Sequence, residues 1–222
     1  MTRNGAPKRG TDSRMELPIT TQLRTLLTTQ PTRPPSPKET ALLQQIHHRR
    51  AVSLQVAQSA MDPTTLQFLV EERYLVIFPT VLGLAVALGF SGRKAIGHTK
   101  HQSFVGLEVA VRSIYQQDVL RMLLEKGAQL QRYTPVKPSE VQLHGQLYLL
   151  LTHPRGMRSP KILKCLNEHR NWLLQNQAKI MLVQPNQRTS QYVQKHLSDV
   201  FVCLDHRLPL TTITKVPTSV KL

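Results

Sequence analysis

Cationic side chains gather in three segments of this sequence, and their chemistry suits phosphate binding. Residues 89–102 (GFSGRKAIGHTKHQ) contain three glycines and no acidic residue, so we predict a flexible loop that can approach a sugar–phosphate backbone closely. The band at 47–50 (HHRR) and the basic turn at 154–160 supply further cations. The residues expected to contact nucleic acid are Arg49, Arg50, Arg93, Lys94, Lys100, Arg155, Arg158 and Lys161.

Two cysteine–histidine pairs have the ligand types of tetrahedral zinc. Cys165 and His169 are four positions apart, and Cys203 and His206 are three apart. The first spacing is uncommon in structural zinc sites, and both cysteines lie in apolar stretches. We therefore predict buried thiols and surface histidines and assign no metal and no other cofactor, although the sequence leaves zinc binding by these four residues open.

The common catalytic motifs do not occur in the sequence. It contains no G-x-x-x-x-G-K-[ST] phosphate loop, no dinucleotide G-x-G-x-x-G and no nucleophile pattern G-x-S-x-G. The acidic candidates in the C-terminal half are Glu140, Glu168, Asp199 and Asp205, and their spacing is not that of a magnesium site. We expect a protein that is not an enzyme.

The helices and strands that the sequence indicates around these residues predict a mixed α/β fold, with a small sheet covered by helices. A serine cap at Ser36 starts a helix over residues 37–60. The closing strand–helix–strand pattern favours parallel pairing. Further helices are predicted at 81–88, 108–126, 162–175 and 189–197, and strands at 74–78, 129–133, 141–152, 179–183 and 200–204.

Composition divides the chain into four parts. Residues 1–37 are expected to be a basic disordered arm with a Pro-rich linker, and 38–138 a helix followed by an α/β domain. Residues 139–210 form the β-α-β unit, and 211–222 a tail. The net charge of +16 is concentrated at both ends, with nine Lys/Arg against three Asp/Glu in residues 1–50 and eleven against three in 155–222. Such charge favours a polyanionic partner.

An uncharged stretch at residues 74–90 (YLVIFPTVLGLAVALGF) admits a second interpretation. Its 17 residues are at the short limit for a membrane-spanning helix, whereas Pro79, Gly83 and Gly89 divide it as a buried strand and helix would be divided. We expect a buried pair of elements, and a membrane partner is the less favoured alternative. The two cysteines and the polar N-terminus, which has no signal peptide, favour a cytoplasmic or nucleoid-associated location.

Two segments resemble the N-terminal mismatch-recognition domain of MutS-type DNA repair proteins. Residues 74–94 are similar to that family's strand, helix and L-G-x-x-x-[TS]-x-[RK] pattern, and residues 106–133 to its glycine-led helix. The resemblance implies an α/β scaffold used on DNA. The family's Phe-x-Glu wedge is replaced by Pro79, Thr80 and Val81, and its ATPase is missing, so mismatch reading is not implied.

These observations favour a non-enzymatic accessory protein that binds nucleic acid mainly through phosphate contacts, with DNA preferred over RNA. Aromatic residues make up only 5% of the chain, which makes base stacking a weaker expectation than backbone contact. Two alternatives stay open: a membrane-associated protein anchored by residues 74–90, and a structural RNA-binding subunit of a ribonucleoprotein, which would have other protein partners. The sequence does not distinguish DNA from RNA or reveal the process or the oligomeric state.

Overall fold

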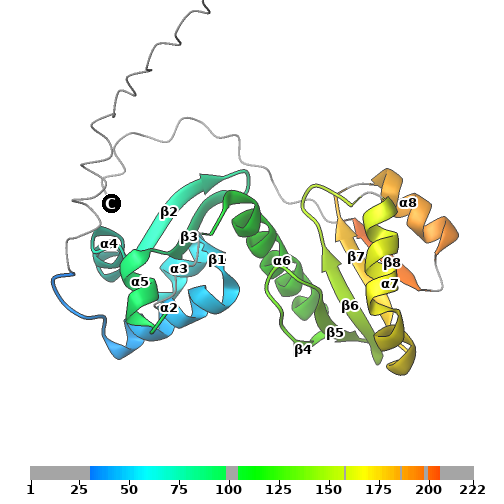
Figure 1. Ribbon diagram of the computed structural model, residues 1–222, viewed down its shortest axis with the longest axis horizontal. Helices are drawn as coiled ribbons and strands as arrows, with labels where there is room; N and C mark the ends of the chain where they lie inside the picture. The colour runs from blue at the N-terminus through cyan, green and yellow to red at the C-terminus, as the bar shows by residue number, and fades with distance from the viewer. Residues whose placement is uncertain (1–30, 99–104, 158, 186, 198–199, 206–222) are drawn as a thin grey trace, which may run out of the picture. The chain divides into compact units, whose positions relative to one another are not determined.

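The computed structural model describes residues 31–98, 105–157, 159–185, 187–197 and 200–205. The first thirty residues of the expected basic arm and the expected tail at 211–222 lie outside these ranges. The mixed α/β class predicted from the sequence is confirmed: helices cover two β-sheets, one of three strands and one of five (Figure 1).

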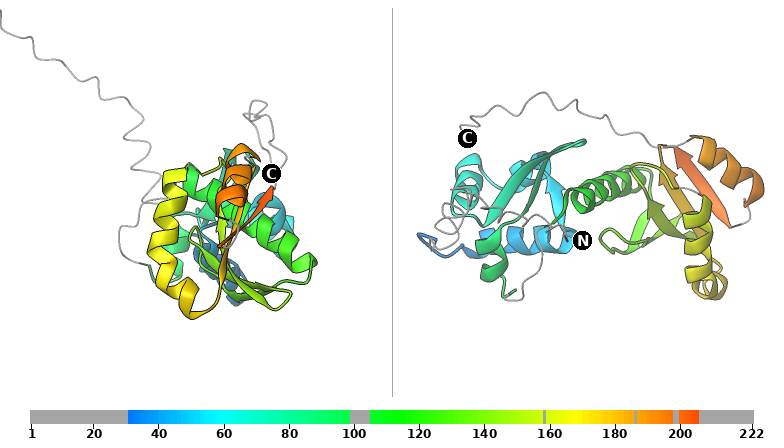
Figure 2. Two further views of the ribbon diagram at one scale, coloured as in Figure 1. Left: turned by 90° about the vertical axis from the view of Figure 1, so that its right-hand side faces the viewer. Right: turned by 45° about the horizontal axis from the view of Figure 1, so that its top comes forward.

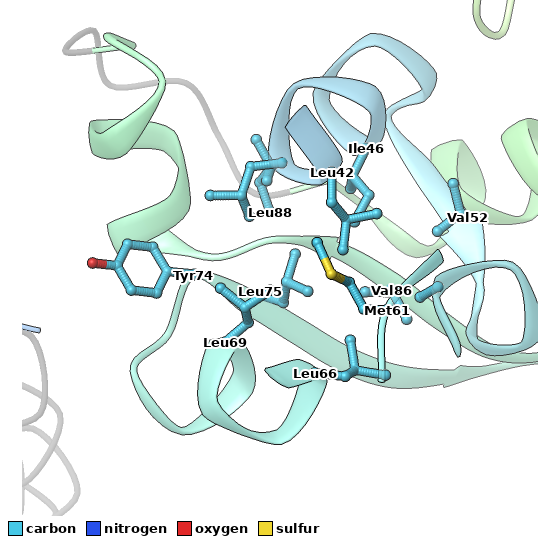
Figure 3. Packing of buried hydrophobic residues seen from close by; sticks show 12 residues of the cluster. Leu42, Ile46, Val52, Met61, Leu66, Leu69, Tyr74, Leu75, Val86 and Leu88 are labelled. Atoms are coloured by element: carbon cyan, nitrogen blue, oxygen red, sulfur yellow. The ribbon is translucent and has the colours of Figure 1, made fainter. Parts of the chain in front are cut away.

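The three-stranded sheet is antiparallel, in the order β1-β3-β2. Its strands are β1 (Ala51–Ser53), β2 (Leu75–Thr80) and β3 (Gly83–Leu88). The helices α2 (Pro37–Arg49), α3 (Leu54–Ala60) and α4 (Pro63–Glu71) supply the apolar side chains that pack on one of its faces (Figure 3). Leu43, Ile46 and Leu69 are fully buried there, and each such side chain contributes roughly 1.5–3 kcal/mol to stability.

The single helix predicted for residues 37–60 begins as expected but ends early. Ser36 and Glu39 form the capping box that the sequence indicates. At Arg50 the backbone turns to a φ of 71°, and the next residues become β1. The carbonyl of Ala51 accepts hydrogen bonds from Ser113 Oγ (3.1 Å) and Gln117 Nε2 (2.7 Å) on α6 (Leu107–Glu125). Because strand pairing and these distant side chains satisfy the backbone, the prediction from local periodicity was wrong here.

The helix predicted for residues 81–88 is also wrong, because these residues form the second half of a β-hairpin. Gly83 takes a φ of 100° directly after a tight turn, in which Thr80 Oγ1 donates to the Gly83 carbonyl at 2.8 Å. β3 is the central strand, and Ala85 and Val86 are buried on opposite faces, which removes the polar alternation that marks most strands. A short apolar run of this kind does not distinguish a strand from a helix.

The segment predicted as a flexible glycine loop begins instead as a short helix, α5 (Phe90–Ala95). Its glycines allow close packing on the turn before β2. A Cβ atom on Gly92 would lie 2.1 Å from the Tyr74 carbonyl oxygen, and one on Gly89 would lie 2.1 Å from that of Arg73. Arg93 and Lys94 are therefore held on a helix that is fixed against the small sheet. No helix in the described ranges is long and apolar enough to cross a membrane.

The five-stranded sheet has the order β4-β5-β6-β7-β8. β4 (Gln129–Arg132), β5 (Ser139–Leu143) and β6 (Gln146–Thr152) are antiparallel, whereas β6, β7 (Lys179–Gln184) and β8 (Phe201–Asp205) are parallel. The predicted parallel β-α-β pattern is thus confirmed. α7 (Ser159–Gln175) and α8 (Gln187–His196) pack on one face and α6 on the other (Figures 1 and 2).

Helix α6 is buried on two sides. Ala110 and Ile114 pack on the alanine-rich face of the small sheet, whereas Tyr115, Val119 and Leu123 pack on the large sheet. The sequence predicts this helix nearly to the residue, but with one apolar face. The second face combines Ala110 and Ile114 with polar side chains, among them the fully buried Ser113, and apolar periodicity does not detect it.

Candidate nucleic-acid interface

The ends of α2 and α5 bring two of the predicted cationic segments together. We call this group the α2–α5 cluster; it consists of His47, His48, Arg49, Arg50, Arg93, Lys94 and His98. The imidazole rings of His47 and His98 join the two segments, with their centroids 4.1 Å apart. The last turn of a helix carries partial negative charge, so cations in the last turn of α2 are electrostatically favoured.

The two chain segments that carry this cluster contain no carboxylate of their own. No Asp or Glu occurs in residues 40–61 or 73–107. In the described ranges, no carboxylate forms an ion pair with Arg49, Arg50 or Lys94. Arg50 and Lys94 are exposed to solvent, whereas Arg49 and Arg93 are half-buried. The cluster therefore presents excess positive charge on elements whose backbone is fixed.

Burial and the surrounding positive charge both act on the protonation of His47. Partial burial lowers the pKa of His47, and the nearby His98, Arg50 and His48 lower it further because they disfavour a second positive charge. His47 is consequently neutral at pH 7. A phosphate bound at the cluster would offset the repulsion from His98 and the arginines, and it would therefore favour the protonated form of His47.

A second group of cations lies at the carboxyl end of β6. We call it the β6–α7 cluster; it consists of Arg112 from α6, His153 and Arg155 from the loop after β6, and Lys161 from α7. Burial lowers the pKa of His153, and Arg112 and Lys161 lower it further, while Glu108 opposes them. The carboxyl ends of parallel strands are a common place for ligand binding in α/β sheets.

The loop that carries His153 and Arg155 is fastened to the neighbouring strand. The His153 amide donates to the Val183 carbonyl at 3.0 Å, and the Met157 amide donates to Gln184 Oε1 at 2.6 Å. Two polar atoms in this cluster, His153 Nδ1 and Arg112 Nε, are buried without a hydrogen-bond partner among the described residues. Such atoms cost free energy unless a further group reaches them.

The predicted contact residues therefore fall into two groups. The segments that carry Arg49 with Arg50 and Arg93 with Lys94 meet at the His47–His98 contact, and Arg155 and Lys161 lie near His153 in the β6–α7 cluster. Lys100 and Arg158 lie outside the described residues. The sequence analysis did not select Arg112 and His153, although the position of His153 directly after a predicted strand of a parallel pair is a usable signal.

The acidic and metal-ligand candidates do not converge in the described ranges. Glu140 pairs with Arg132 at 3.7 Å, and Glu168 pairs with Lys164 at 3.8 Å. Asp199 and His206 lie outside the described residues. Within the part of the chain that the structure describes, no three His, Cys, Asp or Glu residues are grouped as a metal site would require. Burial raises the pKa of the Cys165 thiol to about 11, so this sulfur stays protonated at neutral pH.

Comparison of the chain with protein-family models, curated proteins and solved structures finds no match in any of the three. The functional argument therefore depends on the geometry and charge of the two clusters.

Proposed function

We propose that this protein is a non-enzymatic accessory protein that binds nucleic acid, preferably DNA, through contacts to the phosphate backbone. The observation that carries the proposal is the α2–α5 cluster: two basic segments far apart in the sequence meet in space, with no carboxylate paired to Arg49, Arg50 or Lys94 in the described ranges. A cell compartment that contains nucleic acid, the cytoplasm or the nucleoid, is the proposed location.

The physical driving force is neutralisation of the excess charge. The chain carries a formal net charge of +16, which repels itself in a compact fold. Each phosphate that a Lys or Arg contacts releases counterions condensed on the nucleic acid, and this release favours binding. The β6–α7 cluster would contribute a second point of contact, because Arg155 and Lys161 are exposed and unpaired in the described ranges.

Binding is proposed in preference to catalysis because the described residues offer no set of groups for a reaction. The carboxylates Glu140 and Glu168 are paired with surface cations, as carboxylates ordinarily are. The cationic clusters themselves contain donors and charges but no activated nucleophile.

The test is a titration of fluorescently labelled duplex DNA at several salt concentrations, with an RNA duplex as competitor. We expect a steep fall of affinity with salt. The double variants R50Q/K94Q and R155Q/K161Q should each reduce the log–log slope by roughly 0.9 per lost contact. The control K126Q/K137Q removes the same charge from exposed positions outside both clusters and should change the slope less. Binding that does not depend on salt, or an equal reduction of the log–log slope in all three double variants, would contradict the proposal.

A further inference from the structure

A cavity of about 410 Å³ opens beside the α2–α5 cluster. Its wall is formed by the end of α2, by α3, by α6 and by the edge strand β4 with the residue that follows it. Its volume is within the range of pockets that hold small organic ligands. His48 and Arg49 belong both to the cluster and to the cavity wall, so the cavity and the proposed phosphate contacts are continuous.

The wall of the cavity is largely apolar. Leu120 is buried, whereas Leu124 and Leu130 keep 47% and 39% of their surface exposed. Leucines with this much exposure normally occur singly, but here two of them line the same cavity. Such a wall can accept the face of a planar ring.

Aromatic and polar groups complete the cavity. Tyr133 and His48 lie with ring centroids 5.3 Å apart, tilted by 50°. The Tyr133 hydroxyl is buried and makes no hydrogen bond of good geometry with a described residue, although Arg49 and Ser113 lie close enough to act on its pKa. Burial is the largest influence on this pKa and raises it, so the phenol is neutral at pH 7 and keeps its O–H hydrogen as a hydrogen-bond donor.

The charge at the rim is positive. Arg49 has no paired carboxylate in the described ranges, and Arg121 shares its charge with Asp118 at 3.1 Å. An occupant should therefore combine a flat apolar ring, polar edge atoms and a negative charge within a short distance. A nucleotide has all three, whereas an acidic peptide would need an aromatic residue and a carboxylate arranged by its own fold.

We propose that this cavity binds one unstacked nucleotide, with the base against Leu124, Leu130 and Tyr133 and the phosphate at Arg49. This inference rests on the proposed function, because the α2–α5 cluster would hold the neighbouring phosphates. The nucleotide can be part of a single strand or a free nucleoside monophosphate, since both have the same base and phosphate.

The experiment uses the full-length chain and two probes: a single-stranded oligonucleotide that contains 2-aminopurine, whose fluorescence reports the environment of the base, and free 2-aminopurine ribonucleoside monophosphate. Substituting Leu130 by Trp would fill the cavity without removing charge, and Leu124→Gln would make its wall polar as a second, milder variant. Base stacking contributes enough that we expect about a tenfold loss of single-strand affinity in L130W. L163W, at an exposed leucine on α7, is the matched control.

Binding of duplex DNA separates this inference from the proposed function. If the cavity holds a base, L130W and L124Q lose single-strand affinity and the 2-aminopurine signal but keep duplex affinity and its salt slope. Binding of the free monophosphate, with the same loss in the variants, would also support the cavity and would identify a small-molecule source. Unchanged single-strand binding in both variants, with duplex binding intact, would overturn the cavity alone, and so would preferential binding of an acidic aromatic peptide. If the wild-type protein did not bind duplex DNA at all, the proposed function itself would be overturned.

Discussion

The imidazole rings of His47 and His98 lie with their centroids 4.1 Å apart, although all three strands of the small sheet come between these residues in the sequence. The contact fixes the end of α2 against the residues after α5. Burial and the nearby His98 together make a positive charge on His47 less favourable. The cationic surface therefore has a built-in dependence on pH.

The first prediction concerns this dependence. The pKa of His47 is lower in the folded chain than in the unfolded one, so the unfolded state binds more protons as the pH falls below about 6.5. Stability should decrease from pH 7 downward until the folded pKa is passed. Urea denaturation between pH 7.5 and 5 measures this, and the H47Q variant should show a shallower decrease than the wild type. H169Q, on α7, is the control; an equal effect in both variants would contradict the assignment to His47.

The second prediction concerns Glu39, which is only 3% exposed and accepts hydrogen bonds from Arg33 and from the Ser36 amide. The side-chain hydrogen bond from Arg33 is the main reason that its pKa falls to about 2. The stabilisation is complete above the ordinary pKa near 4.5 and is lost as the pH falls toward 2. Because Arg33 is half-exposed, solvent screening reduces the contribution of this pair to the free energy of unfolding. We expect E39Q to lower that free energy by about 1–2 kcal/mol at pH 7.

Denaturation of E39Q at pH 7 and at pH 2.5 tests this second prediction. The difference from the wild type should be clear at pH 7 and much smaller at pH 2.5, which lies well below the ordinary pKa and close to the folded one. E125Q, at an exposed position at the end of α6, should match the wild type at both pH values. A loss that does not vary with pH would show that the Glu39 side chain matters for packing and not for its charge.

The third prediction concerns Gly92. Alanine there would place Cβ 2.1 Å from the Tyr74 carbonyl, so α5 must move away from β2. We expect a loss of about 1–3 kcal/mol together with weaker DNA binding, because Arg93 and Lys94 move with the helix. Thermal melting and duplex titration measure the two effects. Gly106→Ala, where no atom lies within 4 Å of the added Cβ, is the matched control and should affect both much less.

The fourth prediction concerns the loop of the β6–α7 cluster. Gln184 is fully buried, and its side chain accepts from the Met157 amide and donates to Ser190 Oγ. Gln184→Leu would leave the Met157 amide without a partner and release the loop that carries Arg155, at a cost of about 1–3 kcal/mol. Duplex affinity should fall severalfold in Q184L at a temperature where the variant is still folded. Q131L, at an exposed position on β4, serves for comparison.

Much of the fold could be predicted from the sequence where local signals are strong. The capping box at Ser36, the helix α6 and the closing parallel strands all follow from patterns within a few residues or one helix length. The predictions failed where distant residues decide the local structure. Ala51 becomes a strand because β3 and Gln117 satisfy its backbone, and residues 83–88 become a strand because both faces of β3 are covered.

The candidate site could be predicted only in part for the same reason. Charge composition identifies Arg49, Arg50, Arg93 and Lys94, but it does not show that their two segments meet at His47 and His98. Arg112 was missed because a single arginine on an amphipathic helix resembles any solvated position. Its association with His153 depends on the strand order of the large sheet.

Helix α6 contributes side chains to the cores of both sheets, so neither sheet can keep its packing once this helix is lost. A fragment that ends before residue 105 would expose Ala51, Ala85 and Ala87 to water, and a fragment that starts after residue 125 would lack one cover of its five strands. The described residues should accordingly unfold in one cooperative transition. The α2–α5 cluster and the β6–α7 cluster would then be lost or kept together.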